Sequence, residues 1–200
     1  MIDISKIPTE FTPEIAKNPP KWEDIFSQKK PLELEIGTGR PHFLFERAKS
    51  ISKHNIVGIE YKEQWIKQAL RKIKRENIKN VHAIHGDAWI LIPKLFEKNS
   101  ISAIFLNFPD PWWKKRHQKR RILNANFVDL LVKKMKKDAI FFFQTDVFQI
   151  FEIYHELLAS HNLLAKKELN KDIDIMANSH REKKCKEYDL PIYRALFKKL

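Results

Sequence analysis

The chain has 200 residues, 43% of them hydrophobic, which is the size and composition of a single globular domain. It has 38 Lys and Arg against 25 Asp and Glu, a formal net charge of +13; a small protein this basic most often binds a polyanion, nucleic acid first and an anionic membrane second. The single cysteine, Cys185, excludes an internal disulfide and cannot form a thiolate zinc site alone. No apolar run reaches the roughly 20 residues of a membrane span, and residues 1–10 lack the apolar core of a signal peptide. We therefore expect a soluble, cytoplasmic protein.

Residues 1–30 contain four prolines and no sustained periodicity. They predict an irregular lead-in with a helical turn at Trp22 to Phe26. From Pro31 onward, short apolar runs alternate with amphipathic stretches, and we expect one domain over residues 31–200.

The apolar runs predict strands at residues 32–36, 56–59, 81–84, 101–108, 139–143, 163–169 and 192–197. The amphipathic stretches between them predict helices around residues 43–48, 65–73, 89–96, 124–134 and 148–158. Met135 is expected on the apolar side of the helix at 124–134, and the highly charged stretch before the last strand is expected to be a loop. The alternation of strand and helix favours an α/β fold, with a parallel sheet covered by helices on both faces.

Polar residues follow the first three strands at the point where each strand ends. Glu35, Gly37 and Gly39 end the first strand, Glu60 ends the second, and Asp87 follows the third. Ligands of parallel sheets bind beyond these carboxyl ends. The glycines let the backbone approach a ligand, and the helix after them directs free N–H groups toward it. Glu60 is placed to accept from ribose hydroxyls; Asp87 can accept from an adenine amino group, and Glu35 can order the loop or face an ammonium group.

Two cofactors contain such an adenosine group, a nicotinamide dinucleotide and S-adenosylmethionine. The dinucleotide fingerprint needs a further glycine three positions after Gly39, where this chain has His42. S-adenosylmethionine has no diphosphate and tolerates a less strict loop. A methyltransferase is therefore favoured over a nicotinamide oxidoreductase.

A basic segment follows the fourth predicted strand. Pro109 and Pro111 stiffen the chain around Asp110 and keep it out of a helix. Residues 114–121 contain six Lys or Arg and no acid. Such side chains bind phosphates, and either Trp112 or Trp113 offers a surface on which a base can stack. The segment predicts nucleic-acid binding.

These motifs resemble those of the tRNA (guanine-N7-)-methyltransferases of the bacterial, single-chain type, from about Trp22 to the C-terminus. The strongest element is Phe108-Pro-Asp-Pro-Trp112 with the basic residues that follow it. The stretches 35–39, 58–60, 145–146 and 191–194 also fit. The resemblance implies a Rossmann-like class I S-adenosylmethionine-dependent methyltransferase fold, with a seven-stranded, mostly parallel sheet and an antiparallel last strand. It also implies methylation of N7 on the variable-loop guanosine, position 46, of tRNA.

The resemblance assigns roles to individual positions. Asp110 matches the proposed catalytic residue and also a cofactor contact. The other cofactor positions are Glu35, Gly37, Gly39, Glu60 and Asp87. The substrate positions are Lys114, Arg116, His117, Lys119, Arg120, Arg121 and Asp146, together with Ser179 and Glu182, which align with the family's Thr-x-x-Glu motif.

Two alternatives stay open at this point. The chain can be a non-catalytic RNA-binding protein on the same fold, because Pro41 stands where the family often has a further glycine. It can also be an amino-group methyltransferase, because Asn107-Phe-Pro-Asp-Pro-Trp112 is similar to the Asn/Asp-Pro-Pro-aromatic motif of those enzymes. We expect tRNA as the partner, no membrane, no metal site, and a monomer or a homodimer.

Overall fold

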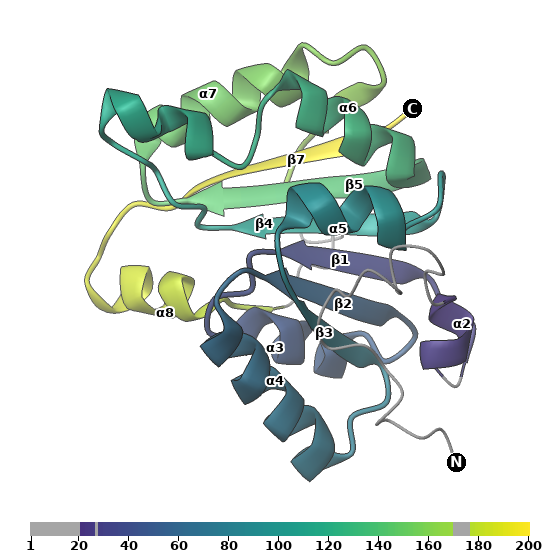
Figure 1. Cartoon of the computed structure of the whole chain (residues 1–200). Helices are drawn as coiled ribbons and strands as arrows, with labels where there is room; N and C mark the ends of the chain where they lie inside the picture. The colour runs from purple at the N-terminus through teal and green to yellow at the C-terminus, as the bar shows by residue number, and fades with distance from the viewer. Residues whose placement is uncertain (1–20, 27, 170–176) are drawn as a thin grey trace.

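The computed structural model describes residues 21–26, 28–169 and 177–200. Within these residues, seven strands form one sheet in the order β3-β2-β1-β4-β5-β7-β6 (Figure 1). The strands are β1 (Leu32–Ile36), β2 (Asn55–Glu60), β3 (Val81–His85), β4 (Ile101–Asn107), β5 (Met135–Thr145), β6 (Leu164–Lys167) and β7 (Tyr193–Lys199). All run in one direction except β7, which is antiparallel to both β5 and β6. The predicted mostly parallel sheet with an antiparallel last strand is confirmed.

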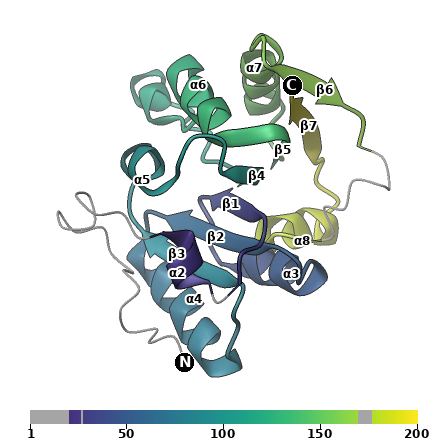
Figure 2. The same cartoon turned by 90° about the vertical axis from the view of Figure 1, so that its right-hand side faces the viewer.

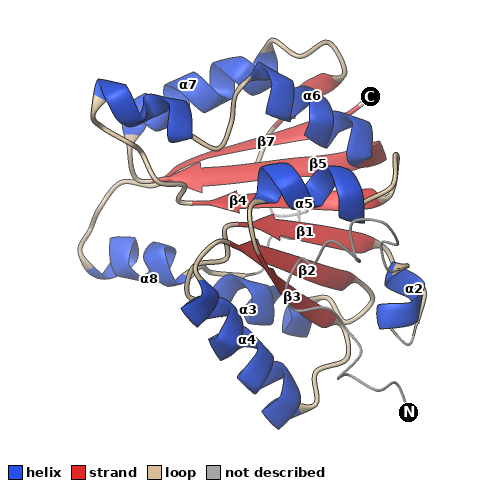
Figure 3. Cartoon of the chain, in the orientation of Figure 1, coloured by secondary structure: helices blue, strands red, loops and turns tan. Residues whose placement is uncertain are grey.

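Helices cover both faces of this sheet (Figures 2 and 3). The helices of the described residues are α2 (Trp22–Ile25), α3 (His42–Ser50), α4 (Glu63–Glu76), α5 (Ala88–Leu95), α6 (Ala125–Lys134), α7 (Phe148–Ala159) and α8 (His180–Glu187), with a 3-10 helix η2 (Lys115–Arg120). Buried residues of α5, α6 and α7 form one core, and those of α3 and α4 form a second core on the other side of the sheet. No helix of the described residues is long and apolar enough to cross a membrane.

The central strands alternate between these two cores. In β5, Phe141 and Phe143 belong to the larger core, whereas Phe142 belongs to the core under α3 and α4. In β4, Ile104 and Phe105 divide in the same way. Because both faces are buried, these strands consist of nearly continuous apolar residues rather than an alternating pattern.

The structure corrects two of the predicted elements. The charged stretch expected as a loop contains α8, whose N-terminus is capped by the Ser179 side chain accepting from the Glu182 backbone N–H at 3.0 Å. A helix is recognised in a sequence by an apolar stripe, and α8 has none, because the residues that it buries are Glu182 and Cys185. The sequence pattern therefore did not predict α8. Met135, expected on the preceding helix, is the first residue of β5. No turn separates α6 from β5, and Met135 follows Leu131 by four positions, so the helical spacing of apolar residues does not mark the boundary.

The end of the expected lead-in packs against the sheet. The helical turn at Trp22 to Phe26 is confirmed as α2, and Ile25 and Phe26 belong to the larger core. The Trp22 indole N–H donates to the Leu95 carbonyl at 2.8 Å. Residues 1–20 of the expected lead-in lie outside the described residues.

Candidate functional site

Glu35 is a buried carboxylic acid at the carboxyl end of β1. Its side chain is 1% exposed, and Oε1 accepts from the Asn107 amide at 3.1 Å. Its Oε2 is buried without a hydrogen-bond partner in the described part of the chain. Burial, with a smaller contribution from the negative charge of Glu60, raises the pKa of Glu35 to about 8. A buried acceptor without a partner is costly, and a cationic ligand would satisfy it.

The loop between β1 and α3 has a left-handed backbone at two glycines. Gly37 has φ +73° and Gly39 has φ +49°, and a Cβ added at either would meet no atom within 4 Å. The Gly39 N–H donates to Glu60 Oε2 at 2.7 Å, and the Lys62 N–H donates to Glu60 Oε1 at 2.8 Å. The loop is therefore tied to the end of β2 and has open space beside both glycines.

Gly58, inside β2, sets how closely this loop approaches the sheet. A Cβ at Gly58 would lie 2.5 Å from Thr38 Cγ2 and 3.0 Å from Leu44 Cδ2. Distances below 3.0 Å do not occur for real side chains. The loop and the start of α3 thus pack directly on the glycine backbone.

Asp87 is exposed and follows β3, the neighbour of β2. Its side chain caps α5 by accepting from the Trp89 N–H at 2.8 Å. The cap is a role that the sequence analysis did not assign, although Asp before a helix is a common N-cap. Glu35, Glu60 and Asp87 therefore lie at the carboxyl ends of three adjacent strands, as predicted.

The chain after β4 adopts an unusual backbone on both sides of Asp110. Phe108 has φ +48° and Trp112 has φ +47°, values that bulky residues rarely adopt. The Phe108 N–H donates to the Gln144 carbonyl at 2.7 Å, which fixes the first of these residues. Asp110 itself is exposed. Such local strain is typical of functional sites.

Three basic side chains brace this loop from within the segment. The Arg120 guanidinium lies 5.2 Å from the Trp112 ring centroid, and the His117 ring contacts the same indole edge-on at 5.8 Å. Arg121 donates from Nε to the Pro111 carbonyl at 3.1 Å. These residues therefore shape the loop, in addition to any contact with RNA.

Other residues of the segment face solvent. Besides Arg120, the exposed cations are Lys114, Lys115, Arg116 and Lys119. Trp113 is 64% exposed, whereas Trp112 is half-buried beneath Arg120. Of the two tryptophans, Trp113 is the one with a free ring surface.

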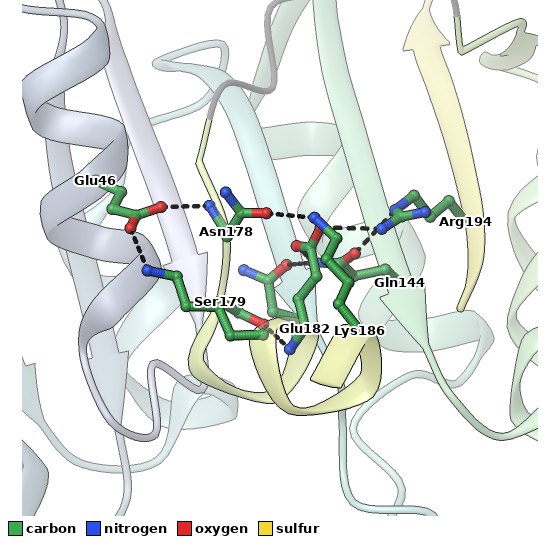
Figure 4. A network of polar contacts seen from close by, with 9 residues as sticks. Glu46, Gln144, Asn178, Ser179, Glu182, Lys186 and Arg194 are labelled. Atoms are coloured by element: carbon green, nitrogen blue, oxygen red, sulfur yellow. Dashed lines mark hydrogen bonds and ion pairs between the residues drawn. The ribbon is translucent and has the colours of Figure 1, made fainter. Parts of the chain in front are cut away.

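The Ser179–Glu182 stretch lies beside the ends of β5 and β7. Glu182 is 6% exposed and accepts from Gln144 Nε2 at 3.1 Å, from Arg194 Nη2 at 3.0 Å and from Lys186 Nζ at 2.9 Å (Figure 4). Burial opposes ionisation of Glu182, but the Lys186 and Gln144 hydrogen bonds outweigh it, so the pKa of Glu182 is lowered. A buried, ionised carboxylate thus anchors α8 to the sheet.

Asp146 follows β5 and pairs with α8 as well. Arg181 donates to Asp146 Oδ2 from Nε at 3.0 Å and also from Nη2. Both bonds end on Oδ2, so Oδ1 is left to accept from a further donor.

A second anchor joins α8 to α3. Glu46 Oε2 accepts from the Asn178 N–H and Oε1 accepts from Lys183 Nζ, each at 2.8 Å (Figure 4). Burial disfavours the ionised form of Glu46, but these hydrogen bonds outweigh that effect and lower the pKa of Glu46 to about 2. The sequence analysis missed Glu46, Asn107 and Gln144. Two of these residues could have been found in the sequence, because Asn107 and Gln144 are polar residues near the ends of apolar strands.

Across the described ranges, no group of three or more His, Cys, Asp or Glu side chains is placed to hold a metal ion. His82 and His85 lie at β3, and His85 Nε2 contacts the Tyr61 carbonyl at 2.9 Å.

The sheet order, the antiparallel β7 and the carboxylates at the ends of β1 and β2 define a class I methyltransferase fold. Solved structures share it. The 16S rRNA methyltransferase KamB aligns with a TM-score of 0.62 at 10% identity, over 89% of this chain and 92% of that one. A 30S ribosomal A1408 methyltransferase from an uncultured bacterium aligns with a TM-score of 0.59 at 21% identity, over 90% and 92%.

Sequence comparison identifies the family to which the chain belongs within this class of methyltransferases. A family model described as a putative methyltransferase matches residues 29–195. A tRNA (guanine-N7-)-methyltransferase of Prochlorococcus marinus is 34% identical over 197 residues, 94% of each chain. One from Listeria welshimeri is 33% identical over 193 residues, 92% of this chain and 90% of that protein. The chain belongs to the tRNA (guanine-N7-)-methyltransferase family.

Proposed function

We propose that this protein transfers the methyl group of S-adenosylmethionine to N7 of guanosine 46 in the variable loop of tRNA. The observation that carries the proposal is the meeting, at one sheet edge, of Glu35 with its unpaired oxygen and the strained, basic loop around Asp110. The family membership supports the same reaction. tRNA as the partner and the cytoplasm as the compartment are part of this proposal.

The residues at the edge fit the cofactor. Its ammonium group would pair with the unpaired Oε2 of Glu35. Each Glu60 oxygen accepts one backbone N–H and keeps a lone pair for a ribose hydroxyl. The open space beside Gly37 and Gly39 leaves room for the methionine moiety, and the exposed Asp87 after β3 would accept from the adenine amino group. When bound, the cofactor supplies the methyl group on a sulfonium sulfur.

Guanine N7 is unprotonated at neutral pH and has an in-plane lone pair, so the reaction needs no strong base. The protein's task is alignment of nitrogen, methyl carbon and sulfur at near-attack distance. Asp110, an exposed carboxylate on a stiff loop, accepts from the guanine N1–H or exocyclic amine, or orients the cofactor amine. Asp146 Oδ1 and Glu182 hold the substrate side of the site.

The basic loop holds the phosphates. Lys114, Arg116 and Lys119 are exposed cations beside Asp110 and give affinity without reading sequence. His117, Arg120 and Arg121 add charge and keep the loop in shape.

The test begins with calorimetric titration of the folded protein with S-adenosylmethionine, then methylation of unmodified tRNA with mapping of the modified atom. We expect binding, a single methyl group at N7 of guanosine 46, and a loss of at least about 100-fold in turnover for Asp110→Asn, since the variant removes the negative charge and turns one acceptor oxygen into an NH₂ donor. Asp138→Asn is the matched control, because Asp138 is likewise an exposed aspartate but lies near the start of β5, at the opposite end of the parallel strands from Asp110.

Other outcomes select the alternatives. A folded protein that binds tRNA but no cofactor, with or without tRNA, would be a non-catalytic RNA-binding protein. A methyl group on an exocyclic amine would make the chain an amino-group methyltransferase. An Asp110→Asn protein with normal turnover and normal tRNA affinity would remove Asp110 from the site.

A further inference from the structure

A continuous run of hydrogen bonds connects Glu35 with Glu182 through the interior. Asn107 Nδ2 donates to Glu35 Oε1 at 3.1 Å, and Asn107 Oδ1 accepts from Gln144 Nε2 at 2.9 Å. Gln144 Nε2 also donates to Glu182 Oε2 at 3.1 Å (Figure 4). Two amides thus join the carboxylate assigned to the cofactor with the carboxylate assigned to the tRNA side.

The sheet register places these amides side by side. Asn107 pairs with Gln144 across β4 and β5, and Gln144 pairs with Arg194 across β5 and β7. Gln144 is 1% exposed and Asn107 is 8% exposed, so neither has bulk water as an alternative partner. The run is therefore a fixed part of the interior rather than a surface contact.

The direction of every bond in the run is determined by Arg194. A guanidinium can donate but cannot accept, and Arg194 Nε lies 3.1 Å from Gln144 Oε1. Gln144 must therefore turn its NH₂ toward Glu182 and Asn107. Asn107 then accepts with its oxygen and turns its own NH₂ toward Glu35. One arrangement makes every bond of the run, and a flip of either amide breaks it.

We propose that Gln144 is a positioning residue that couples cofactor binding at Glu35 to tRNA binding at the Ser179–Glu182 stretch. The inference rests on the proposed function for the identity of the two ligands. It adds that each ligand binds more tightly when the other is present, because both ligands strengthen the same hydrogen-bonded arrangement of Gln144.

The charge on Glu35 gives the coupling its sign. Because burial raises the pKa of Glu35 to about 8, the carboxyl group is mostly protonated at pH 7 in the free protein. An ammonium ligand stabilises the ionised form, and Asn107 then donates to a full charge, a bond about twice as strong as one to a neutral group. This strengthens the orientation of Asn107 and Gln144 that holds Glu182 and, through it, α8.

The experiment measures tRNA affinity with and without saturating S-adenosylhomocysteine, which has the ammonium group and no transferable methyl. For the natural protein we expect about 5-fold tighter binding or more with the ligand, and the same ratio for the ligand with and without tRNA. Gln144→Met keeps the length of the side chain but loses both the NH₂ and the oxygen of its amide, and its ratio should fall to within about 2-fold of unity. Gln149→Met, an exposed glutamine on α7, is the matched control and should keep the full ratio.

A Gln144→Met protein that binds both ligands and keeps the full ratio would overturn the proposal, as would a ratio of unity in the natural protein. A natural protein that binds no cofactor-type ligand would instead contradict the proposed function itself. Should Gln144→Met fail to fold, Asn107→Leu interrupts the same run without touching Glu182. It must show the same loss of the ratio, and a retained ratio there also overturns the proposal.

Discussion

Arg47 of α3 and Glu33 of β1 form a two-bond ion pair inside the protein. Nε donates to Oε2 at 2.8 Å and Nη2 donates to Oε1 at 2.7 Å, with the side chains 4% and 1% exposed. The guanidinium also lies 5.0 Å from the Phe105 ring centroid. The pair fixes the C-terminal half of α3 on the start of β1.

Removing Arg47 should therefore destabilise the fold strongly. Arg47→Met leaves Glu33 buried without its main partner, and we expect a loss of about 3–5 kcal/mol in the free energy of unfolding, measured with urea. The double variant Glu33→Leu, Arg47→Met should lose less, because no unpaired carboxylate is left in the interior. Lys67→Met, which breaks an exposed pair with Glu63, should cost below about 1 kcal/mol. If Arg47→Met lowers the free energy of unfolding as little as Lys67→Met does, the buried ion pair does not stabilise the fold as proposed.

The raised pKa of Glu35 predicts how stability depends on pH. The folded pKa, about 8, lies above the ordinary 4.5, so the folded state binds more protons between these values. Its contribution makes stability fall as pH rises through this window, by at most about 1.4 kcal/mol per pH unit. Unfolding at pH 5 to 8, compared with Glu35→Gln, isolates the effect. The Gln variant should lack this part of the slope, and equal slopes for the two proteins would refute the prediction.

The two tryptophans of the basic segment should behave differently. Trp113→Ala should weaken tRNA binding by about 1–3 kcal/mol with little change in thermal stability, because its exposed ring is the one free to stack on a base. Trp112→Ala should lower thermal stability, because Arg120 and His117 pack on that ring. Binding titrations and thermal unfolding of both variants check this. Unchanged tRNA affinity for Trp113→Ala would exclude the stacking role.

The exposed cations should determine the salt dependence of binding. Replacing Arg116 and Lys119 by Ala should reduce the slope of log affinity against log salt by about 1.4 to 1.8, because two phosphate contacts are lost. Replacing Lys136 and Lys137, exposed at the far end of β5, serves as the control and should leave the slope unchanged. Equal effects of the two pairs would mean that the segment acts through net charge alone.

The strand pattern could be predicted because each strand is a short apolar run with a polar residue at its end. Glu35 and Glu60 are visible in the sequence for the same reason, since parallel strands bring their carboxyl ends to one edge. The antiparallel placement of β7 did not follow from the apolar pattern and came from the family resemblance alone.

The contacts that complete the site could not be predicted from local patterns. Gln144 and Asn107 meet because of the register between β4 and β5, which single-strand periodicity does not specify. Glu46 meets Lys183 across a separation of 137 positions. The helix α8 depends on a cap and on buried ionic anchors, so it lacks the apolar stripe by which helices are recognised.

The close packing around Gly58 limits the substitutions that the family can accept at this position. Thr38 Cγ2 is the atom that a new Cβ at Gly58 would meet first. A lineage can therefore acquire alanine in the middle of β2 only after position 38 has lost its methyl group, as in Thr38→Ser, and after Leu44 has adjusted. Alanine at position 58 should therefore occur only together with a residue at position 38 that lacks this methyl group, although neither side chain needs to touch a ligand.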